Sequence, residues 1–178
     1  MRILTHICCA PCFAYPHKKL KEQNHDVVGF WYNPNIHPFL EYKAREDSVK
    51  KYALLEKAEI IYGEYELPAY LQRTVKSKEK KERCKQCYKH RLEKTALCAK
   101  EKNYDAFTTT LLVSQHQKHN IIKKIGMLLS EKHSIPFYYM DFREGWNQGK
   151  AIATHYSLYR QKYCGCIYSE WERYQHSL

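Results

Sequence analysis

The sequence predicts an α/β fold in which a parallel sheet of about five strands is flanked by helices. Short β-prone apolar runs alternate with amphipathic segments along most of the 178 residues. The connecting segments are long enough to hold helices, so successive strands are expected to pair in parallel through crossover helices. The length suits a single domain over residues 1–178, and we find no internal repeat or linker rich in Pro, Gly or Ser.

The first third of the chain contains three of the expected strands. A buried strand is indicated by the apolar run DVVGFWY, and a helix is expected after Pro11 because proline is tolerated in a first helical turn. The Asn33-Pro34 pair then breaks the chain before a long amphipathic helix. The expected order is strand 2–7, helix 11–24, strand 26–32, helix 38–58 and strand 59–63.

The middle of the chain departs from this alternation. We expect a helical insertion over residues 66–103, made of helices 67–75 and 84–102, within the α/β domain. After it the alternation resumes with strand 106–112, helix 117–132, strand 135–142 and helix 150–161.

Charge points to a polyanionic partner. Thirty Lys and Arg residues against nineteen Asp and Glu residues give a net charge of +11. The run KSKEKKER is the expected RNA contact, although such runs are more often solvated faces; its cations are Lys76, Lys78, Lys80, Lys81 and Arg83. No apolar run is long enough to span a bilayer and the N-terminus does not resemble a signal peptide, so we expect a cytoplasmic protein without a membrane partner.

Eight cysteines in a chain expected in a reducing compartment indicate metal binding or redox chemistry. Cys8, Cys9 and Cys12 fall where the first strand gives way to a helix, and a helix N-terminus favours thiolate. Cys84 and Cys87 have i, i+3 spacing and share a helix face. These thiols fit either a structural zinc or an iron–sulfur cluster, and the 71 residues between Cys12 and Cys84 favour the cluster.

Cys164 and Cys166 form a third group in the motif YCGC. A bridge between them would close a small strained ring, and strained disulfides are readily reduced and tend to be catalytic. The alternative is two unrelated thiols. We interpret Cys98 as an ordinary packed cysteine, since it lies on the middle helix well beyond the Cys84 pair.

Ligands of open α/β sheets bind where strands end, and several candidate residues fall near such ends. Tyr32 and Asn33 are candidates for substrate binding, although Asn33-Pro34 is also a turn signal. Asp141 is a candidate proton donor and Arg143 a candidate substrate contact, although the two also suit a surface ion pair.

Six motifs in this order resemble the cobalamin-independent epoxyqueuosine reductases along nearly the whole chain. They are HICCAPC, YNPNIHPFLEYKAR, RCKQCYKHRL, FTTTLLVS, MDFREG and YRQKYCGCIYS. The resemblance implies a nucleotide α-hydrolase-like fold and the last step of queuosine formation, in which epoxyqueuosine in the tRNA anticodon loop is reduced with electrons from a donor that the sequence does not identify.

The same resemblance implies the cofactors. Cys8, Cys9, Cys84 and Cys87 would hold a [4Fe–4S] cluster, Cys164 and Cys166 would form a redox-active disulfide, and Cys12 is the candidate contact to an additional iron. ATP chemistry is not expected, because no glycine precedes Gly29 where a phosphate loop would lie.

Two other functions compete with this one. A non-catalytic, zinc-stabilised RNA-binding module would explain the charge and four cysteines but not the Cys-Gly-Cys motif. A thiol oxidoreductase acting on proteins would use Cys164 and Cys166 alone.

Overall fold

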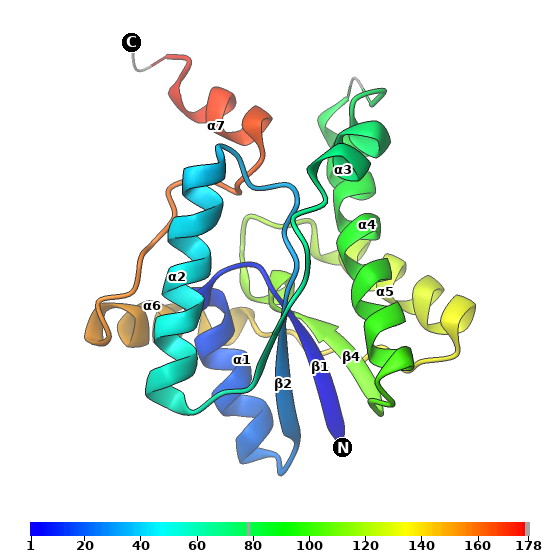
Figure 1. Ribbon diagram of the computed structural model, residues 1–178, viewed down its shortest axis with the longest axis vertical. Helices are drawn as coiled ribbons and strands as arrows, with labels where there is room; N and C mark the ends of the chain where they lie inside the picture. The colour runs from blue at the N-terminus through cyan, green and yellow to red at the C-terminus, as the bar shows by residue number, and fades with distance from the viewer. Residues whose placement is uncertain (78, 177–178) are drawn as a thin grey trace.

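A four-stranded parallel sheet forms the centre of the computed structural model, which describes residues 1–77 and 79–176 (Figure 1). Its strand order is β3-β2-β1-β4. The strands are β1 (Arg2–Ile7), β2 (Asp26–Trp31), β3 (Ile60–Tyr62) and β4 (Ala106–Thr109). This architecture confirms the α/β fold class that the sequence predicts.

The two central strands are buried on both faces, which explains their continuous apolar character. Five of the six residues are buried in each of β1 and β2. The register places Ile3 opposite Val27 and Ile7 opposite Trp31, so large apolar side chains lie beside one another along the sheet.

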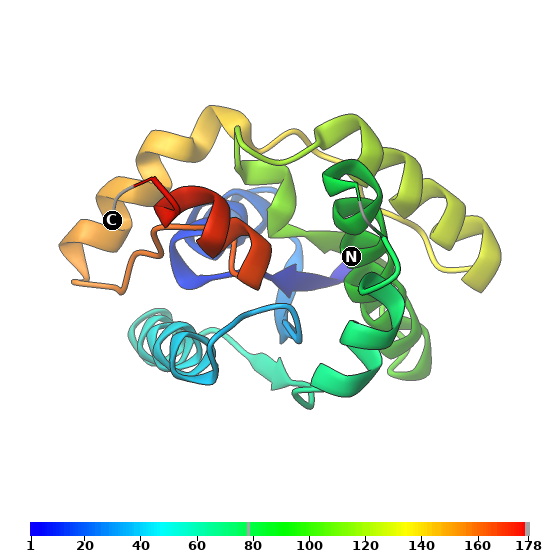
Figure 2. The ribbon, with the colours of Figure 1, turned by 90° about the horizontal axis from the view of Figure 1, so that it is seen from above.

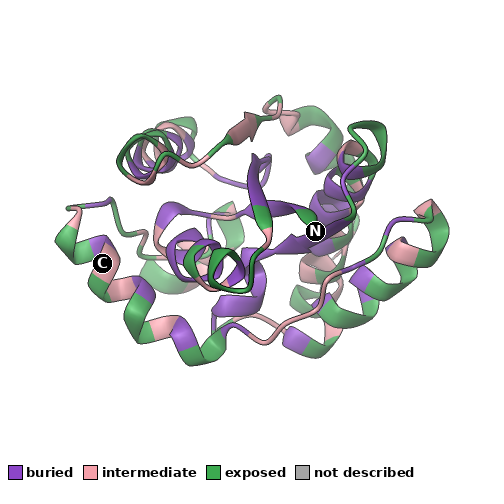
Figure 3. Cartoon of the chain, turned by 90° about the horizontal axis from the view of Figure 1, so that it is seen from below, coloured by how far each residue is buried: buried purple, intermediate pink, exposed green. Residues whose placement is uncertain are grey.

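Helices cover both faces of the sheet and make three layers (Figures 1 and 2). One layer contains α1 (Ala10–Glu22), α2 (Phe39–Glu56) and α6 (Trp146–His155), and the other contains α4 (Lys80–Glu101) and α5 (His119–His133). Buried residues lie toward the sheet and exposed residues face outward (Figure 3). Among the described residues, no helix is both long and apolar enough to cross a membrane.

The strand predicted at residues 135–142 is wrong in length, because the structure forms only a single β-bridge there. Residues 135–142 meet the sheet through one parallel bridge between Phe107 and Phe137, with two backbone hydrogen bonds to Phe107. Pro136 lacks an amide N–H, so this segment cannot build a continuous ladder there. The strand predicted at 106–112 is likewise shorter, because the 3₁₀ turn η1 (Thr110–Val113) follows β4 directly.

The helices differ from prediction at their ends. The helix predicted at 84–102 already begins at Lys80, because Lys, Glu and Arg are good helix formers. The final helix, predicted at 150–161, runs over 146–155 and follows the 3₁₀ turn η2 (Arg143–Gly145). The helix α7 (Ile167–Tyr174) was not predicted, whereas the short α3 (Leu67–Thr74) lies as predicted between β3 and α4.

The carboxyl ends of the strands define one edge of the sheet, at the top in Figure 1. The segment after β1 carries the N-terminal cysteines, and α7 lies above this edge when the molecule is viewed from above (Figure 2). Chain segments from both ends of the sequence therefore meet at the edge where open α/β sheets bind ligands.

Buried histidines make the stability of the fold dependent on pH. Burial lowers the pKa of His17 to about 4, and its ring stacks on Phe13 and hydrogen-bonds the Tyr52 hydroxyl at 3.0 Å. Because the unfolded chain binds a proton near pH 6.5 and the folded chain does not, the stability present above that pH falls as the pH falls toward 4.

We predict that His17→Phe makes stability less dependent on pH. Between pH 7 and pH 5, the free energy of unfolding of the variant should fall by about 1–2 kcal/mol less than that of the parent. The measurement is urea unfolding at several pH values. His155, which is exposed on α6, provides the control: His155→Gln should keep the parent pH dependence. If the free energy of unfolding of His17→Phe fell with pH as steeply as that of the parent, His17 would not be the source of this pH dependence.

Candidate metal and redox site

Three cysteines meet at the end of β1. The Sγ atoms of Cys8, Cys9 and Cys12 all lie within 4.8 Å of one another, and those of Cys8 and Cys9 are 3.8 Å apart. Cys9 has extended backbone geometry at the N-cap of α1, and Cys12 lies in the first turn of that helix. The chain thus turns where the adjacent cysteines require a turn, and the triad has a donor set that can hold a metal ion.

The triad concentrates negative charge on one sulfur. Hydrogen bonds from Cys12 and Cys9 hold the pKa of the Cys8 thiol well below its ordinary value, and the Thr110 hydroxyl adds a hydrogen bond at 3.2 Å. Burial raises the pKa of Cys9, and donation to Cys8 raises that of Cys12. A thiolate at Cys8 is the form that ligates metals.

The second cysteine pair lies across a cavity from the C-terminal pair. Cys84 and Cys87, in the second turn of α4, line a cavity of about 230 Å³ together with Cys164 and Cys166. Burial raises the pKa of Cys87 to about 11, so a metal must displace its proton to bind. The cavity wall is otherwise mainly aromatic and basic.

An adjoining cavity of about 550 Å³ is lined by Cys8, Cys12 and again Cys164. Cys164, Arg91 and Gln117 border both cavities. The Gln117 amide nitrogen lies 3.5 Å from the Cys164 sulfur. The structure therefore brings together thiols from three distant segments, with Cys164 at their junction.

Arg91 is a buried cation among these thiols. Its side chain is 1% exposed, and its guanidinium lies within electrostatic range of Cys87, Cys164 and Cys8. Its Nε donates to the Cys87 carbonyl, whereas its Nη2 has no hydrogen-bond partner among the described residues. A buried arginine without a carboxylate partner indicates that the site is built to surround negative charge.

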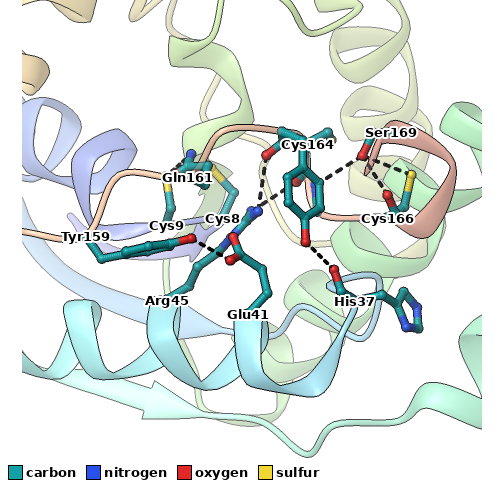
Figure 4. Close-up of polar contacts among 12 residues, drawn as sticks. Cys8, Cys9, His37, Glu41, Arg45, Tyr159, Gln161, Cys164, Cys166 and Ser169 are labelled. Atoms are coloured by element: carbon teal, nitrogen blue, oxygen red, sulfur yellow. Dashed lines mark hydrogen bonds and ion pairs between the residues drawn. The ribbon is translucent and has the colours of Figure 1, made fainter. Parts of the chain in front are cut away.

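The C-terminal thiols are carried on a segment that we call the strap, Tyr159–Cys166. Arg45 on α2 donates to the carbonyls of Tyr163 and Cys164, each at 3.1 Å, and to Glu41 at 2.7 Å (Figure 4). The Tyr159 hydroxyl donates to the other oxygen of Glu41 (Figure 4). The 2% exposed Arg45 side chain thus fixes the strap across the edge of the sheet.

Two further contacts hold the Cys-Gly-Cys turn. The amide of His37 donates to the Gly165 carbonyl at 2.7 Å, and the Tyr163 hydroxyl donates to the His37 carbonyl (Figure 4). Gly165 has φ +124°, and a Cβ there would lie 3.1 Å from Arg45 Nη1. Glycine is therefore required both by the backbone and by the close approach of Arg45.

The strap also reaches the N-terminal triad. The Gln161 amide donates to the Cys9 sulfur at 2.9 Å (Figure 4), although its Oε1 has no partner in the described chain. Gln161, Arg45 and Glu41 were not predicted as site residues, since each is an ordinary residue in its local pattern. A signal is present in YNPNIHPFLEYKAR, the family motif that contains both Glu41 and Arg45.

The predicted substrate residues Tyr32 and Asn33 line neither of these two cavities. The buried Tyr32 hydroxyl donates to Glu66 and contacts His90 at 2.8 Å. Asn33 donates to the Ile7 carbonyl at 2.7 Å and so braces the end of β1 before the cysteines. A direct substrate contact by either residue stays a prediction.

The predicted pair Asp141 and Arg143 is exposed and lies outside the linings of both cavities. The Arg143 guanidinium holds the pKa of the Asp141 carboxyl at about 2. An ionised carboxylate has no proton to give near neutral pH, so this geometry favours the surface ion pair among the two interpretations of the sequence. A role of either residue in the reaction stays a prediction.

Two cations of the basic run line the cavity that contains Cys84 and Cys87. Lys80 and Arg83 line the cavity and pair with Glu172 on α7, at 2.5 and 3.5 Å. Lys76 and Lys81 are exposed, and Lys78 lies outside the described residues. Cys98 is part of neither cavity lining and packs against the hydrophobic core.

Fold and site together define a class: an α/β protein in which cysteines of three separated segments line two adjoining cavities. Comparison with known proteins makes this specific. Residues 3–172 match the family described as "Epoxyqueuosine reductase QueH". The chain therefore belongs to the epoxyqueuosine reductase QueH family.

Individual relatives agree with this assignment. The "Epoxyqueuosine reductase QueH" of Dehalococcoides mccartyi is 37% identical over 174 residues, which are 97% of this chain and 94% of that protein. The protein of the same name from Thermotoga maritima is 34% identical over 179 residues, covering 96% of this chain and 91% of the relative. For the Helicobacter pylori protein the identity is 38%, with 94% of this chain but 49% of the relative covered.

One solved structure shares the fold. A predicted subunit of a tRNA methyltransferase from Methanocaldococcus jannaschii superimposes with a TM-score of 0.60 at 13% identity, over 86% of this chain and 74% of that one. This likeness shows the fold alone, and it agrees with the nucleotide α-hydrolase-like fold that the family resemblance implies.

We predict that Arg45→Met releases the strap. The variant lacks both hydrogen bonds to the strap carbonyls and leaves Glu41 without its cation, which should cost about 3 kcal/mol of stability. Under reducing conditions, Cys164 and Cys166 should become roughly tenfold more reactive toward alkylation, as measured by mass spectrometry of the modified peptides. Leu54→Ala on the same helix, at an 82% exposed position, should change neither quantity. Equal alkylation rates in the two variants would show that Arg45 does not hold the strap.

Proposed function

We propose that this chain reduces the epoxide of epoxyqueuosine in tRNA to the cyclopentene of queuosine, the final step of queuosine biosynthesis. The observation that carries the proposal is the convergence of thiols from three segments on two adjoining cavities, with Cys164 bordering both. Membership of the epoxyqueuosine reductase family identifies the reaction, and the thiols provide the reducing chemistry.

The residue types present suit an iron–sulfur cluster, since three thiols gather in the triad and two more on α4 line the adjoining cavity. Cys8, Cys9, Cys84 and Cys87 would provide the four thiolate ligands of a [4Fe–4S] centre, with Cys12 contacting one additional iron beside it. The buried Arg91, whose Nη2 has no hydrogen-bond partner in the described part of the chain, would offset the negative charge of the thiolate ligands. When bound, such a cluster supplies electrons singly, and an iron with an open position polarises an epoxide oxygen as a Lewis acid.

The dithiol of Cys164 and Cys166 can supply the electrons and protons that the reaction consumes. Breaking both C–O bonds of the epoxide gives an alkene and one water, and consumes two electrons and two protons. Oxidation of two thiols to one disulfide releases the same two electrons and two protons. The strap contacts keep Cys164 at the junction of the cavities, where Gln117 orients its sulfur, and an external donor of two electrons must then reduce the disulfide again.

The residues around the cavities suit a tRNA substrate. The two linings together contain seven cations but a single carboxylate, Glu172. The cations are Arg45, Lys80, Arg83, Arg91, Lys118, Lys162 and Arg173. Such an excess attracts the phosphate backbone of a nucleic acid.

The direct test is an anaerobic assay with epoxyqueuosine-containing tRNA, a strong chemical reductant and nucleoside mass spectrometry. The proposal predicts conversion of epoxyqueuosine to queuosine by iron-loaded protein. Absence of conversion with an intact cluster would refute the function, and stoichiometric zinc without iron in anaerobically purified protein would favour the zinc-stabilised RNA-binding module.

We predict that replacing Cys8, Cys9, Cys84 or Cys87 by Ser, one at a time, strips or degrades the cluster. Each variant should lose most of its iron and the broad visible absorption of thiolate-bound iron, because a hydroxyl is a poor ligand for such clusters. Cys98→Ser is the matched control and should retain both. Iron content equal to that of the parent in all four variants would refute the ligand set.

We predict a different outcome for the double variant Cys164→Ser, Cys166→Ser. It should retain iron and bind tRNA, yet lose at least 90% of multiple-turnover conversion, because the two-electron store is gone. Iron analysis and the nucleoside assay on the same preparation measure both properties. Full activity would show that the electrons reach the substrate by another route.

We predict that Lys76→Gln together with Lys81→Gln weakens tRNA binding and makes it less dependent on salt. For each phosphate that the variant no longer neutralises, the slope of log affinity against log salt should fall by roughly 0.7–0.9. Affinity measured at several salt concentrations gives the slope. Lys57→Gln together with Lys124→Gln, two exposed lysines outside both cavity linings, is the charge-matched control. If the slope of log affinity against log salt equalled that of the parent, the basic run at residues 76–83 would be a solvated face.

A further inference from the structure

The C-terminal helix α7 exposes an apolar face above the site. Every residue of this helix is at least partly exposed. Ile167, Trp171 and Tyr174 follow i, i+4, i+7 spacing and therefore share one face, with exposed fractions of 55%, 60% and 37%. An apolar stripe of this kind on a surface helix marks an interaction site.

Polar contacts on another side of α7 fix the helix to the body. Glu172 pairs with Lys80 and Arg83 on α4, and the Arg83 guanidinium stacks over the Tyr168 ring at 4.0 Å. Ser169 accepts a hydrogen bond from the Gly165 amide at 3.3 Å and so ties the helix to the Cys-Gly-Cys turn (Figure 4). The helix is thus held in place while its apolar stripe remains available.

The stripe is continuous with the thiol cavity. Ile167, its first member, lines the cavity that contains Cys84, Cys87, Cys164 and Cys166. Trp171 and Tyr174 follow on the same helix face and line neither thiol cavity. A ligand in the cavity therefore has its immediate covalent neighbours beside this stripe.

We propose that the Ile167–Trp171–Tyr174 face of α7 is a stacking platform for unpaired bases of an RNA loop, next to the nucleotide that enters the thiol cavity. The proposal rests on the proposed function. Unpaired bases stack on exposed aromatic rings, and the cationic cavity linings would attract the phosphates that join those bases. The two cavity linings, to which α7 contributes residues, contain seven cations and one carboxylate, which favours RNA over an uncharged protein partner.

The test uses unmodified RNA and needs no turnover, so it is separate from the reductase assay. Trp171→Ala should bind a tRNA anticodon stem–loop roughly 5-fold to 100-fold more weakly than the parent, with an unchanged salt slope. Binding of a fully paired duplex of equal length should be unaffected, because stacked bases offer no free faces. Leu54→Ala, at an 82% exposed apolar position on α2, controls for the loss of surface apolar area.

Fluorescence gives a second readout without removing the aromatic residue. In a Trp146→Phe background, Trp171 is the exposed tryptophan and Trp31 is buried. The emission of Trp171 should be quenched on titration with the stem–loop but not with the duplex.

Three outcomes of these tests are decisive. If Trp171→Ala bound the stem–loop as tightly as the parent does, the proposal would be overturned. If the same variant instead lost concentration-dependent self-association while its RNA affinity was unchanged, a second copy of the chain would be the occupant. Stem–loop binding that depends on Trp171, without conversion of the substrate, would refute the reductase function alone.

Discussion

The buried guanidinium of Arg45 is the contact on which the geometry of the site depends. The parallel sheet brings the end of β1 and the start of α4 toward one edge, but the C-terminal thiols reach that edge only because the strap is held there. Arg45 donates to two strap carbonyls and to Glu41, and Glu41 accepts from Tyr159. These hydrogen bonds are charge-assisted, and Arg45 makes its own from a side chain that is 2% exposed.

Charge explains why cysteines and cations occur together here. A thiolate in a buried site is costly unless positive groups or hydrogen-bond donors surround it. Cys8 obtains those donors from neighbouring thiols and from Thr110, while Arg91 contributes a buried positive charge between the cysteine groups. Further cations line the same two cavities, so under the proposed function one electrostatic arrangement would serve both the metal ligands and a polyanionic substrate.

Much of the fold and of the cysteine site could be predicted from the sequence, because the patterns that indicate them lie within short stretches of the chain. Strand and helix periodicity indicated the α/β class, and the turn at Pro11 allowed Cys8, Cys9 and Cys12 to meet, as they do. The fifth strand failed because Pro136 cannot donate to a ladder, which a pattern of apolar residues does not reveal. Arg45 and Gln161 were missed because their partners are more than a hundred residues away along the chain, and no local pattern records such contacts.

The central claim is that the thiols at the two ends of the chain form one reducing centre, and stoichiometry tests it most directly. Iron-loaded protein with reduced Cys164 and Cys166 is mixed anaerobically with excess epoxyqueuosine-containing tRNA and no other reductant. Queuosine and the Cys164–Cys166 disulfide are then counted in the same sample by mass spectrometry. We expect one disulfide for each queuosine formed. Queuosine formation with both thiols still reduced would contradict the claim.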